Sequence, residues 1–141
     1  MLEALQPLVG RWQSTGRTIP GAFDPGVTIS GTDVYEWLGT GYLIHHVDVT
    51  MSPDHVQVLE IIGDYDEATR TYAMHAYDGS GTTSEMRASV DGDGVWTFTD
   101  DAVRATLTIA GDGRTMAARW DRVADDGTWQ RWMDMHFDRT D

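Results

Sequence analysis

The sequence predicts an all-β protein: a ten-stranded antiparallel up-and-down β-barrel with a short N-terminal helical turn and an internal cavity. Turn-forming residues interrupt the chain at nine short, fairly even intervals, and the stretches between them are rich in Val, Ile, Thr, Tyr and Trp. Within those stretches apolar and polar residues alternate with a period of two, which is typical of strands with one apolar and one solvated face.

The nine breaks are rich in Gly, Pro and Asp, and Asp-Gly and Gly-Asp pairs supply the positive φ angles that tight hairpins require. They fall at residues 20–26, 39–41, 52–54, 66–70, 78–81, 91–94, 100–101, 110–113 and 124–127. Nine consecutive hairpin breaks imply ten strands in a meander. Closure into a barrel removes both exposed edges, and about ten strands enclose more space than side chains readily fill. An open two-layer sandwich is the alternative.

The N-terminus is the one segment that reads as helix. Leu2, Leu5 and Leu8 stand at helical spacing, and Pro7 limits the length of the helix. We expect this turn to plug one end of the barrel. The Gly- and Pro-rich residues 19–26 are expected to form either a mobile loop near the cavity mouth or a passive connection.

Composition limits the classes of function. The 141 residues suit one domain, 1–141, and the start of the chain lacks the pattern of a secretory signal, so we expect a cytoplasmic protein. The absence of Cys excludes thiolate chemistry and Cys-bound metals, and the absence of Lys excludes a lysine Schiff base. A net charge of -13 repels nucleic acid and anionic membranes, so neither is expected as a partner. We expect a monomer or a homodimer.

The third predicted strand places a histidine inside the barrel. Its inward set is Leu43, His45, Val47, Val49 and Met51. His45 is then either a hydrogen-bonded structural residue or a catalytic one. His46 and Asp48 would lie outside, where they offer two metal ligands but no identified third, so no metal site is expected.

Two further candidates, His75 and Tyr77, depend on which face of their strand points into the barrel. His75 and Tyr77 share one face of their strand, and Tyr72 and Met74 share the other. If the first face points inward, His75 and Tyr77 form an acid–base pair at the cavity; if it points outward, they are surface residues.

Glu60 stands among apolar residues, where a carboxyl group suits general acid–base work. Glu60 alternatively neutralises a buried arginine, for which Arg131 and Arg122 are the candidates.

The final predicted strand offers two opposite faces. One consists of Trp129, Arg131, Met133, Met135 and Phe137, and the other of Trp132, Asp134, His136 and Asp138. Four apolar residues of five predict that the first face points inward, which leaves His136 solvated. An inward Arg131 needs an acidic neighbour or an anionic ligand, or it stacks over Trp12 to close the barrel end.

Several segments resemble known families. The run Leu8-Val9-Gly10-Arg11-Trp12 is similar to the Gly-x-Trp signature that opens the first strand of lipocalins and fatty-acid-binding proteins. Residues 35–43 (YEWLGTGYL), 61–66 (IIGDYD) and 77–81 (YDGSG) resemble a large bacterial group of calycin-like domains of unknown function. The resemblance implies a β-barrel with an internal pocket.

A narrower resemblance is to nitrobindin, a ten-stranded haem barrel that carries its iron-ligating His near the C-terminus. It implies His136 as the ligand, although Ser14 stands where the nitrobindin pattern has a second Gly. The Arg-x-Tyr pair with which fatty-acid-binding proteins hold a carboxylate is not matched on the last predicted strand, where the nearest positions are Arg131-x-Met133 and Met135-x-Phe137.

The sequence thus predicts binding of a small hydrophobic or amphipathic molecule inside the barrel, without a cofactor or metal. The residues expected to hold it are His45, Met86, Trp96, Trp120, Arg131, Met133 and Met135. The first alternative is a cavity enzyme of the cyclase, isomerase or lyase type, with His45, Glu60, His75 or Tyr77 as proton-transfer groups. The second alternative is haem binding through His136.

Overall fold

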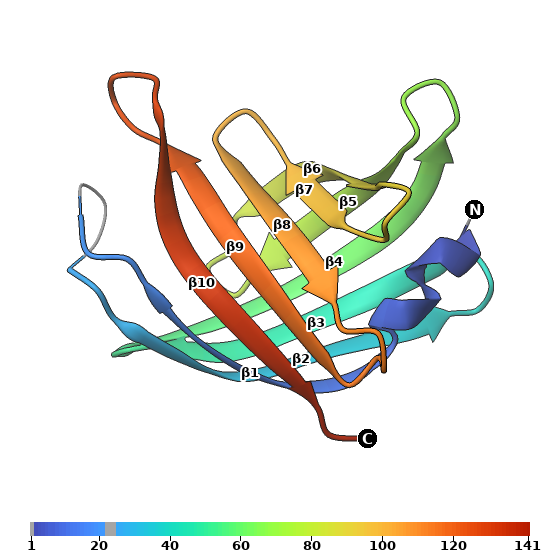
Figure 1. Ribbon diagram of the computed structural model, residues 1–141, viewed down its shortest axis with the longest axis horizontal. Coiled ribbons are helices and arrows are strands. Elements are labelled where there is room, and N and C mark those ends of the chain that lie inside the picture. The colour runs from blue at the N-terminus through green and yellow to red at the C-terminus, as the bar shows by residue number, and fades with distance from the viewer. Residues whose placement is uncertain (1, 22–24) are drawn as a thin grey trace.

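The chain forms a closed barrel of ten antiparallel strands that follow one another around the barrel in chain order (Figure 1). The computed structural model describes residues 2–21 and 25–141. Its elements are η1 (Leu2–Leu8), β1 (Gly10–Thr18), β2 (Thr28–Leu38), β3 (Tyr42–Met51), β4 (Asp54–Asp66), β5 (Thr71–Asp78), β6 (Thr83–Val90), β7 (Trp96–Thr99), β8 (Val103–Ile109), β9 (Thr115–Val123) and β10 (Trp129–Arg139). The predicted strand count and the barrel closure are confirmed.

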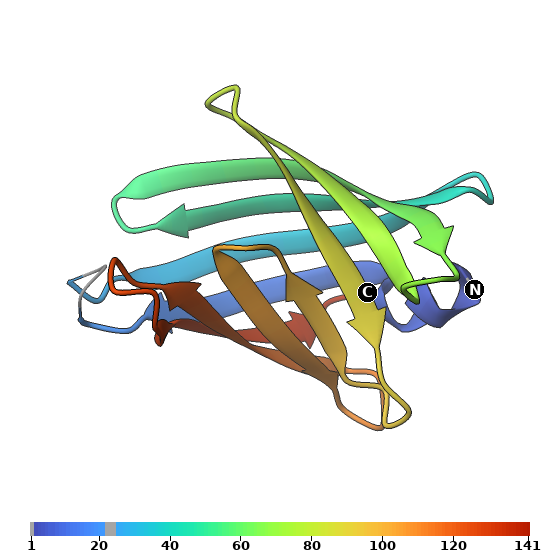
Figure 2. The ribbon, with the colours of Figure 1, turned by 90° about the horizontal axis from the view of Figure 1, so that it is seen from above.

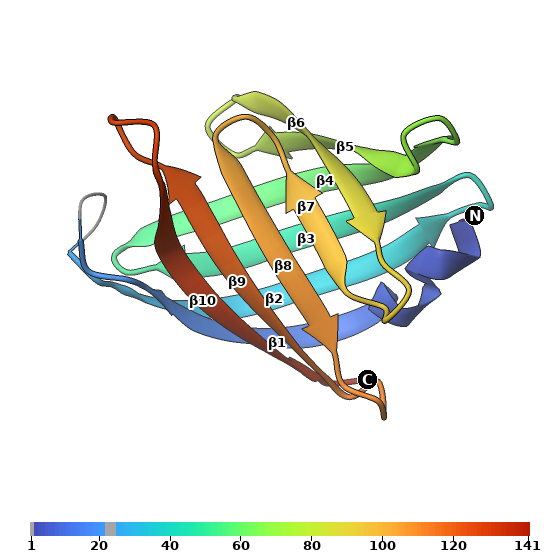
Figure 3. The same ribbon diagram turned by 45° about the horizontal axis from the view of Figure 1, so that its top comes forward.

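All nine predicted breaks coincide with connections between strands, because hairpins need the backbone freedom that Gly, Pro and Asp supply there. Pairing of β1 with β10 closes the sheet, and their register places Trp12 opposite Arg139. Strands β7–β10 lie across the barrel interior from β2–β4 (Figure 3). The β5–β6 hairpin reaches away from the rest of the barrel (Figure 2), since β7 pairs only with residues 87–90 of β6. The predicted loop at 19–26 includes residues 22–24, which lie outside the described residues.

The N-terminal turn plugs one barrel end as predicted, as a 3₁₀ helix with Pro7 inside it. Leu5 and Leu8 are fully buried and join the hydrophobic core. The indole Nε1–H of Trp12 donates to the Leu8 carbonyl oxygen at 3.0 Å, which ties the helix to the first strand. No helix among the described residues has the length and apolar character that crossing a membrane requires.

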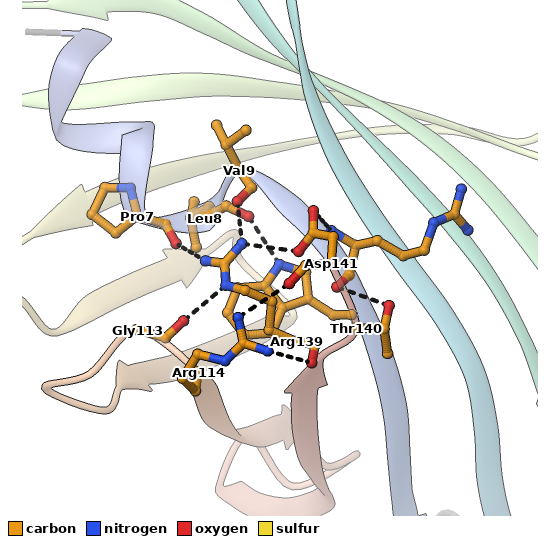
Figure 4. Close-up of polar contacts among 10 residues, drawn as sticks. Pro7, Leu8, Val9, Gly113, Arg114, Arg139, Thr140 and Asp141 are labelled. Atoms are coloured by element: carbon orange, nitrogen blue, oxygen red, sulfur yellow. Dashed lines mark hydrogen bonds and ion pairs between the residues drawn. The ribbon is translucent and has the colours of Figure 1, made fainter.

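An arginine at the end of the last strand seals the same end (Figure 4). The Arg139 guanidinium carbon lies 4.2 Å from the centre of the Trp12 ring, a cation–π contact. Its N–H groups donate to the carbonyl oxygens of Val9 at 2.7 Å, Gly113 at 2.9 Å and Pro7 at 3.3 Å. One side chain therefore joins η1, the β8–β9 turn and β1 to the end of β10.

This contact corrects one expectation and explains the Gly-x-Trp motif. The prediction that Arg131 stacks over Trp12 is wrong, because β10 continues to Arg139 and brings that residue opposite Trp12. A Cβ atom at Gly10 would overlap Nη1 of Arg139, and Gly10 has a φ of 140°. Only glycine therefore leaves room for the guanidinium.

The predicted face of β10 is right in its second half and wrong in its first. Met133, Met135 and Phe137 line the barrel interior as predicted, and Trp132, which was predicted to face outward, lines it as well. The register between β9 and β10 shifts between Arg131 and Met133, a β-bulge that turns Arg131 outward. The side chain of Arg131 is 44% exposed and pairs with Asp134 instead of an inward partner.

Arg139→Ala is expected to lower the free energy of unfolding by about 2–3 kcal/mol, because three backbone oxygens lose a charged donor and Trp12 loses its cation. Arg131→Ala is the matched control and should change it by less than about 0.5 kcal/mol, since its ion pair is exposed. Urea denaturation of both variants measures the difference. Equal effects of the two substitutions would contradict the closing role of Arg139.

Candidate functional site

The barrel encloses a cavity of about 290 Å³ whose wall is mostly apolar. The apolar lining residues are Ile29, Val47, Val49, Met51, Val56, Val58, Met74, Met86, Phe98, Leu107, Ala118, Trp120, Trp132, Met133, Met135 and Phe137. The polar ones are Asp33, Tyr35, His45 and Glu60. A mainly apolar concave surface with a few convergent polar groups is typical of small-molecule sites.

The four polar residues come from three neighbouring strands, and register brings them together. Tyr35 on β2 lies directly opposite His45 on β3, and His45 lies directly opposite Glu60 on β4. Asp33 precedes Tyr35 by two residues and therefore shares its inward face. The sheet thus gathers the polar groups on one side of an otherwise apolar cavity.

Asp33, His45 and Glu60 form a buried triad. The two ring nitrogens of His45 lie 2.6 Å from Asp33 Oδ2 and 3.0 Å from Glu60 Oε1. The hydroxyl of Ser14, fully buried on β1, donates to Asp33 Oδ1 at 2.5 Å. A continuous hydrogen-bonded chain therefore crosses the four strands β1–β4.

The triad is held rigidly. The Tyr35 and His45 rings stack with centroids 3.9 Å apart and an interplanar angle of 8°. Both imidazole nitrogens are engaged, so the ring of His45 can neither rotate nor flip without breaking a hydrogen bond. The polar patch of the cavity wall, which consists of Asp33, Tyr35, His45 and Glu60, is consequently preorganised.

Electrostatics make His45 a cation. Burial alone would lower the pKa of the imidazole, but hydrogen bonds and charge attraction from Asp33 and Glu60 outweigh burial and raise it to about 9. Both His45 nitrogens therefore carry protons at neutral pH and donate to the two carboxylates. Burial, and then the negative charges of Asp33 and Glu60, raise the pKa of Tyr35 well above its ordinary value, so Tyr35 remains a neutral phenol.

Two polar atoms face the cavity with hydrogen-bonding capacity to spare. Glu60 uses Oε1 for His45, and within the described part of the chain neither Glu60 Oε2 nor the Tyr35 hydroxyl has a hydrogen-bond partner. Every fully buried side-chain N or O atom of the described residues has a hydrogen-bond partner. Because these two atoms have none, they are not fully buried, and they are open to the cavity that their residues line. They are the groups with which a ligand can form new hydrogen bonds.

The structure places six of the predicted site residues in the cavity wall. These are His45, Glu60, Met86, Trp120, Met133 and Met135. Trp96 instead lies in the hydrophobic core, 1% exposed, between Tyr72 and Phe98 at centroid distances of 5.8 and 6.2 Å. Arg131 is outside the cavity because of the β10 bulge. Contact of the six with a ligand stays a prediction.

Glu60 has a different partner from the one expected. Its carboxylate pairs with His45 on the adjacent strand and not with Arg131 or Arg122. His45 is hydrogen-bonded through both ring nitrogens, as the structural alternative expects, and it also faces the cavity. A catalytic role for His45 stays a prediction.

Other proton-transfer candidates lie on the outer surface. β5 points Tyr72 and Met74 inward, which leaves the side chain of His75 41% exposed beside Glu85 and Tyr77 48% exposed. Acid–base chemistry in the cavity would therefore depend on Glu60, because both nitrogens of His45 are already bonded to carboxylates. The cavity-enzyme alternative stays a prediction, with Glu60 as its proton-transfer group.

The residues do not fit the haem alternative. The side chain of His136 is 53% exposed and lies 3.2 Å from Asp138 on the outer face, so it cannot ligate a group inside the barrel. His46 and Asp48 are also external, bonded to Glu36 and His55 respectively. Over residues 2–21 and 25–141 no cluster of His, Asp or Glu is arranged to hold a metal ion.

Sequence reasoning missed Ser14, Asp33 and Tyr35. The alternation along β2 could have revealed two of them, since Ile29, Asp33 and Tyr35 share the inward parity. Ser14 is predictable only as an inward residue of β1, two positions after Trp12. Its bond to Asp33 depends on the register between β1 and β2.

Comparison with known proteins extends the fold assignment. The crystal structure of Rv2717c from M. tuberculosis has a TM-score of 0.71 at 17% identity, and the match covers 99% of this chain and 97% of that one. A de novo designed fluorescence-activating β-barrel has a TM-score of 0.50 at 15% identity over 99% of this chain and 100% of the design. At these identities the likeness concerns the fold alone.

A search of curated proteins gave no match. A family model described as "Protein of unknown function (DUF1579)" matches residues 2–139, which is nearly the whole chain. The chain therefore belongs to the DUF1579 family.

Proposed function

We propose that this protein binds a small amphipathic molecule inside its barrel. The observation that carries the proposal is the cavity itself, an apolar wall interrupted on one side by the preorganised triad and two open hydrogen-bonding atoms. Burial of an apolar ligand body stabilises the complex by about 25 cal/mol per Å² removed from water. The polar patch would fix the orientation of the ligand.

The two ends of the barrel differ in a way that supports this role. One end is sealed by η1 and by the Arg139 contact over Trp12, so a ligand would enter from the opposite end. The Gly-x-Trp start of β1 and the arginine on the last strand also favour a place among calycin-like barrels, which we include in the proposal. Cytoplasmic location stays a prediction.

Binding of Nile red, an uncharged apolar dye, tests the proposal. We expect dye fluorescence to rise on binding to the protein, and Val47→Trp to weaken the affinity about tenfold or more, because the larger ring fills part of the cavity that Val47 lines. Fluorescence titration measures both affinities.

Val34→Trp is the matched control. Val34 lies on the adjacent strand β2 with outward parity, so the same substitution enlarges the surface and leaves the cavity unchanged. It should alter the affinity by less than about twofold. Equal weakening by the two variants, or no dye binding by the unmodified protein, would contradict binding inside the barrel.

A further inference from the structure

We propose that the ligand of this cavity is a lipophilic amine, whose protonated nitrogen binds Glu60 Oε2 and whose apolar body fills the methionine- and tryptophan-lined space. The inference rests on the proposed function and specifies the head group of the ligand. It follows from the charge of the cavity, from the atoms left unpartnered and from the nature of the wall.

The polar patch carries a net negative charge. Asp33 and Glu60 each bring a carboxylate, and His45 lies between them as the one basic side chain among the described residues that line the cavity. Two negative charges and one positive charge leave the patch with one net negative charge. A buried net charge is unfavourable unless an opposite charge approaches, so the cavity favours a cationic ligand over an anionic one.

The free hydrogen-bonding atoms indicate the same chemistry. Glu60 Oε2 accepts hydrogen bonds and cannot donate while the carboxylate is ionised. A ligand carboxylate would offer only acceptors to it, whereas an ammonium group offers up to three donors. The Tyr35 hydroxyl, which also lines the cavity, can accept a second bond from the same group.

The wall suits the remainder of such a molecule. Trp120 and Trp132 meet edge to face with centroids 6.2 Å apart, and Met133 and Met135 add polarisable thioethers beside them. Aromatic faces attract cations, and methionine adapts to flexible apolar chains. The described lining contains no arginine, and the sequence contains no lysine, so nothing there would hold a fatty-acid carboxylate.

Three probes with the same alkyl chain and different head groups test the inference: decylamine, decanol and decanoate. Each is titrated as a competitor of Nile red at neutral pH, where the alkylamine is protonated. We expect decylamine to bind at least about tenfold more tightly than decanoate, and we expect the affinity of decanol to lie between the two. This ranking is measured on the unmodified protein and needs no variant that must fold.

Two variants locate the preference. Glu60→Gln keeps an acceptor for His45 and removes the charge, so it should reduce the preference for decylamine over decanoate about tenfold. Glu85→Gln makes the same change on an exposed side chain of β6 and should preserve the preference. This control separates the cavity from the general attraction of a surface with a net charge of -13.

The outcomes distinguish the two levels of the proposal. Decanol binding in the cavity without a preference for decylamine, or equal effects of Glu60→Gln and Glu85→Gln, overturns the amine inference and leaves the proposed function standing. Failure of Nile red and of all three probes to bind overturns both.

Discussion

Replacing His45 with leucine is expected to lower the free energy of unfolding by about 3–5 kcal/mol at neutral pH. The substitution keeps an apolar body of similar size but removes the cation between Asp33 and Glu60. Both carboxylates would then be buried with no opposite charge beside them, and desolvated unpaired charge is strongly unfavourable. Urea denaturation, with the midpoint and slope fitted separately, gives the change.

His46→Leu is the matched control on the adjacent residue. Its side chain is 50% exposed on the outer face, where it pairs with Glu36, so the change should be less than about 1 kcal/mol. Adding Glu60→Gln to His45→Leu should restore part of the lost stability, because it removes one of the two stranded charges. Equal effects of His45→Leu and His46→Leu, or no recovery in the double variant, would contradict the role of His45 as the internal counter-charge.

The fold was largely predictable because local signals repeat along the whole chain. Each hairpin break has its own Gly, Pro or Asp residues, and each strand has its own alternation, so ten strands follow without knowledge of the pairing. The inward set of β3, including His45, came from the same alternation. These features depend on residues that are close in sequence.

The errors about Arg131 share a physical cause, which is that the alternation of inward and outward residues changes phase at a β-bulge. At the bulge in β10 one extra residue enters the strand, and the parity that is right for Met133 and Met135 is therefore wrong for Arg131. No residue type in this segment marks the bulge. The Arg131 error then assigned the wrong arginine to Trp12, although Arg139 is the residue that the β1–β10 register brings there.

Two of the three triad residues were predicted, and the third was missed for a related reason. His45 and Glu60 were each singled out, but as separate candidates, because their contact depends on the β3–β4 register. Asp33 was missed, and with it the explanation of how a histidine stays charged inside an apolar cavity. Charge compensation among strands is a property of the assembled sheet, and no single strand contains it.

The pH dependence of stability is expected to carry the signature of His45. Its pKa of about 9 in the folded protein exceeds the ordinary value of 6.5 that we assign to the unfolded chain. Below pH 6.5 the imidazole is protonated in both states, and the full stabilisation by Asp33 and Glu60 is present. As pH rises from 6.5 through 9 the unfolded chain no longer binds this proton, so the contribution, about 3 kcal/mol, is progressively lost.

Urea denaturation at pH 6, 7.5 and 9.5 tests this result, with His45→Leu as the reference at each pH. Tyr35, the other titratable group stacked on the ring, stays neutral through this window because burial raises its pKa well above the ordinary value. The stability gap between the unmodified protein and His45→Leu should therefore narrow as pH rises. A gap that is constant from pH 6 to 9.5 would mean that His45 is not held as a cation between Asp33 and Glu60.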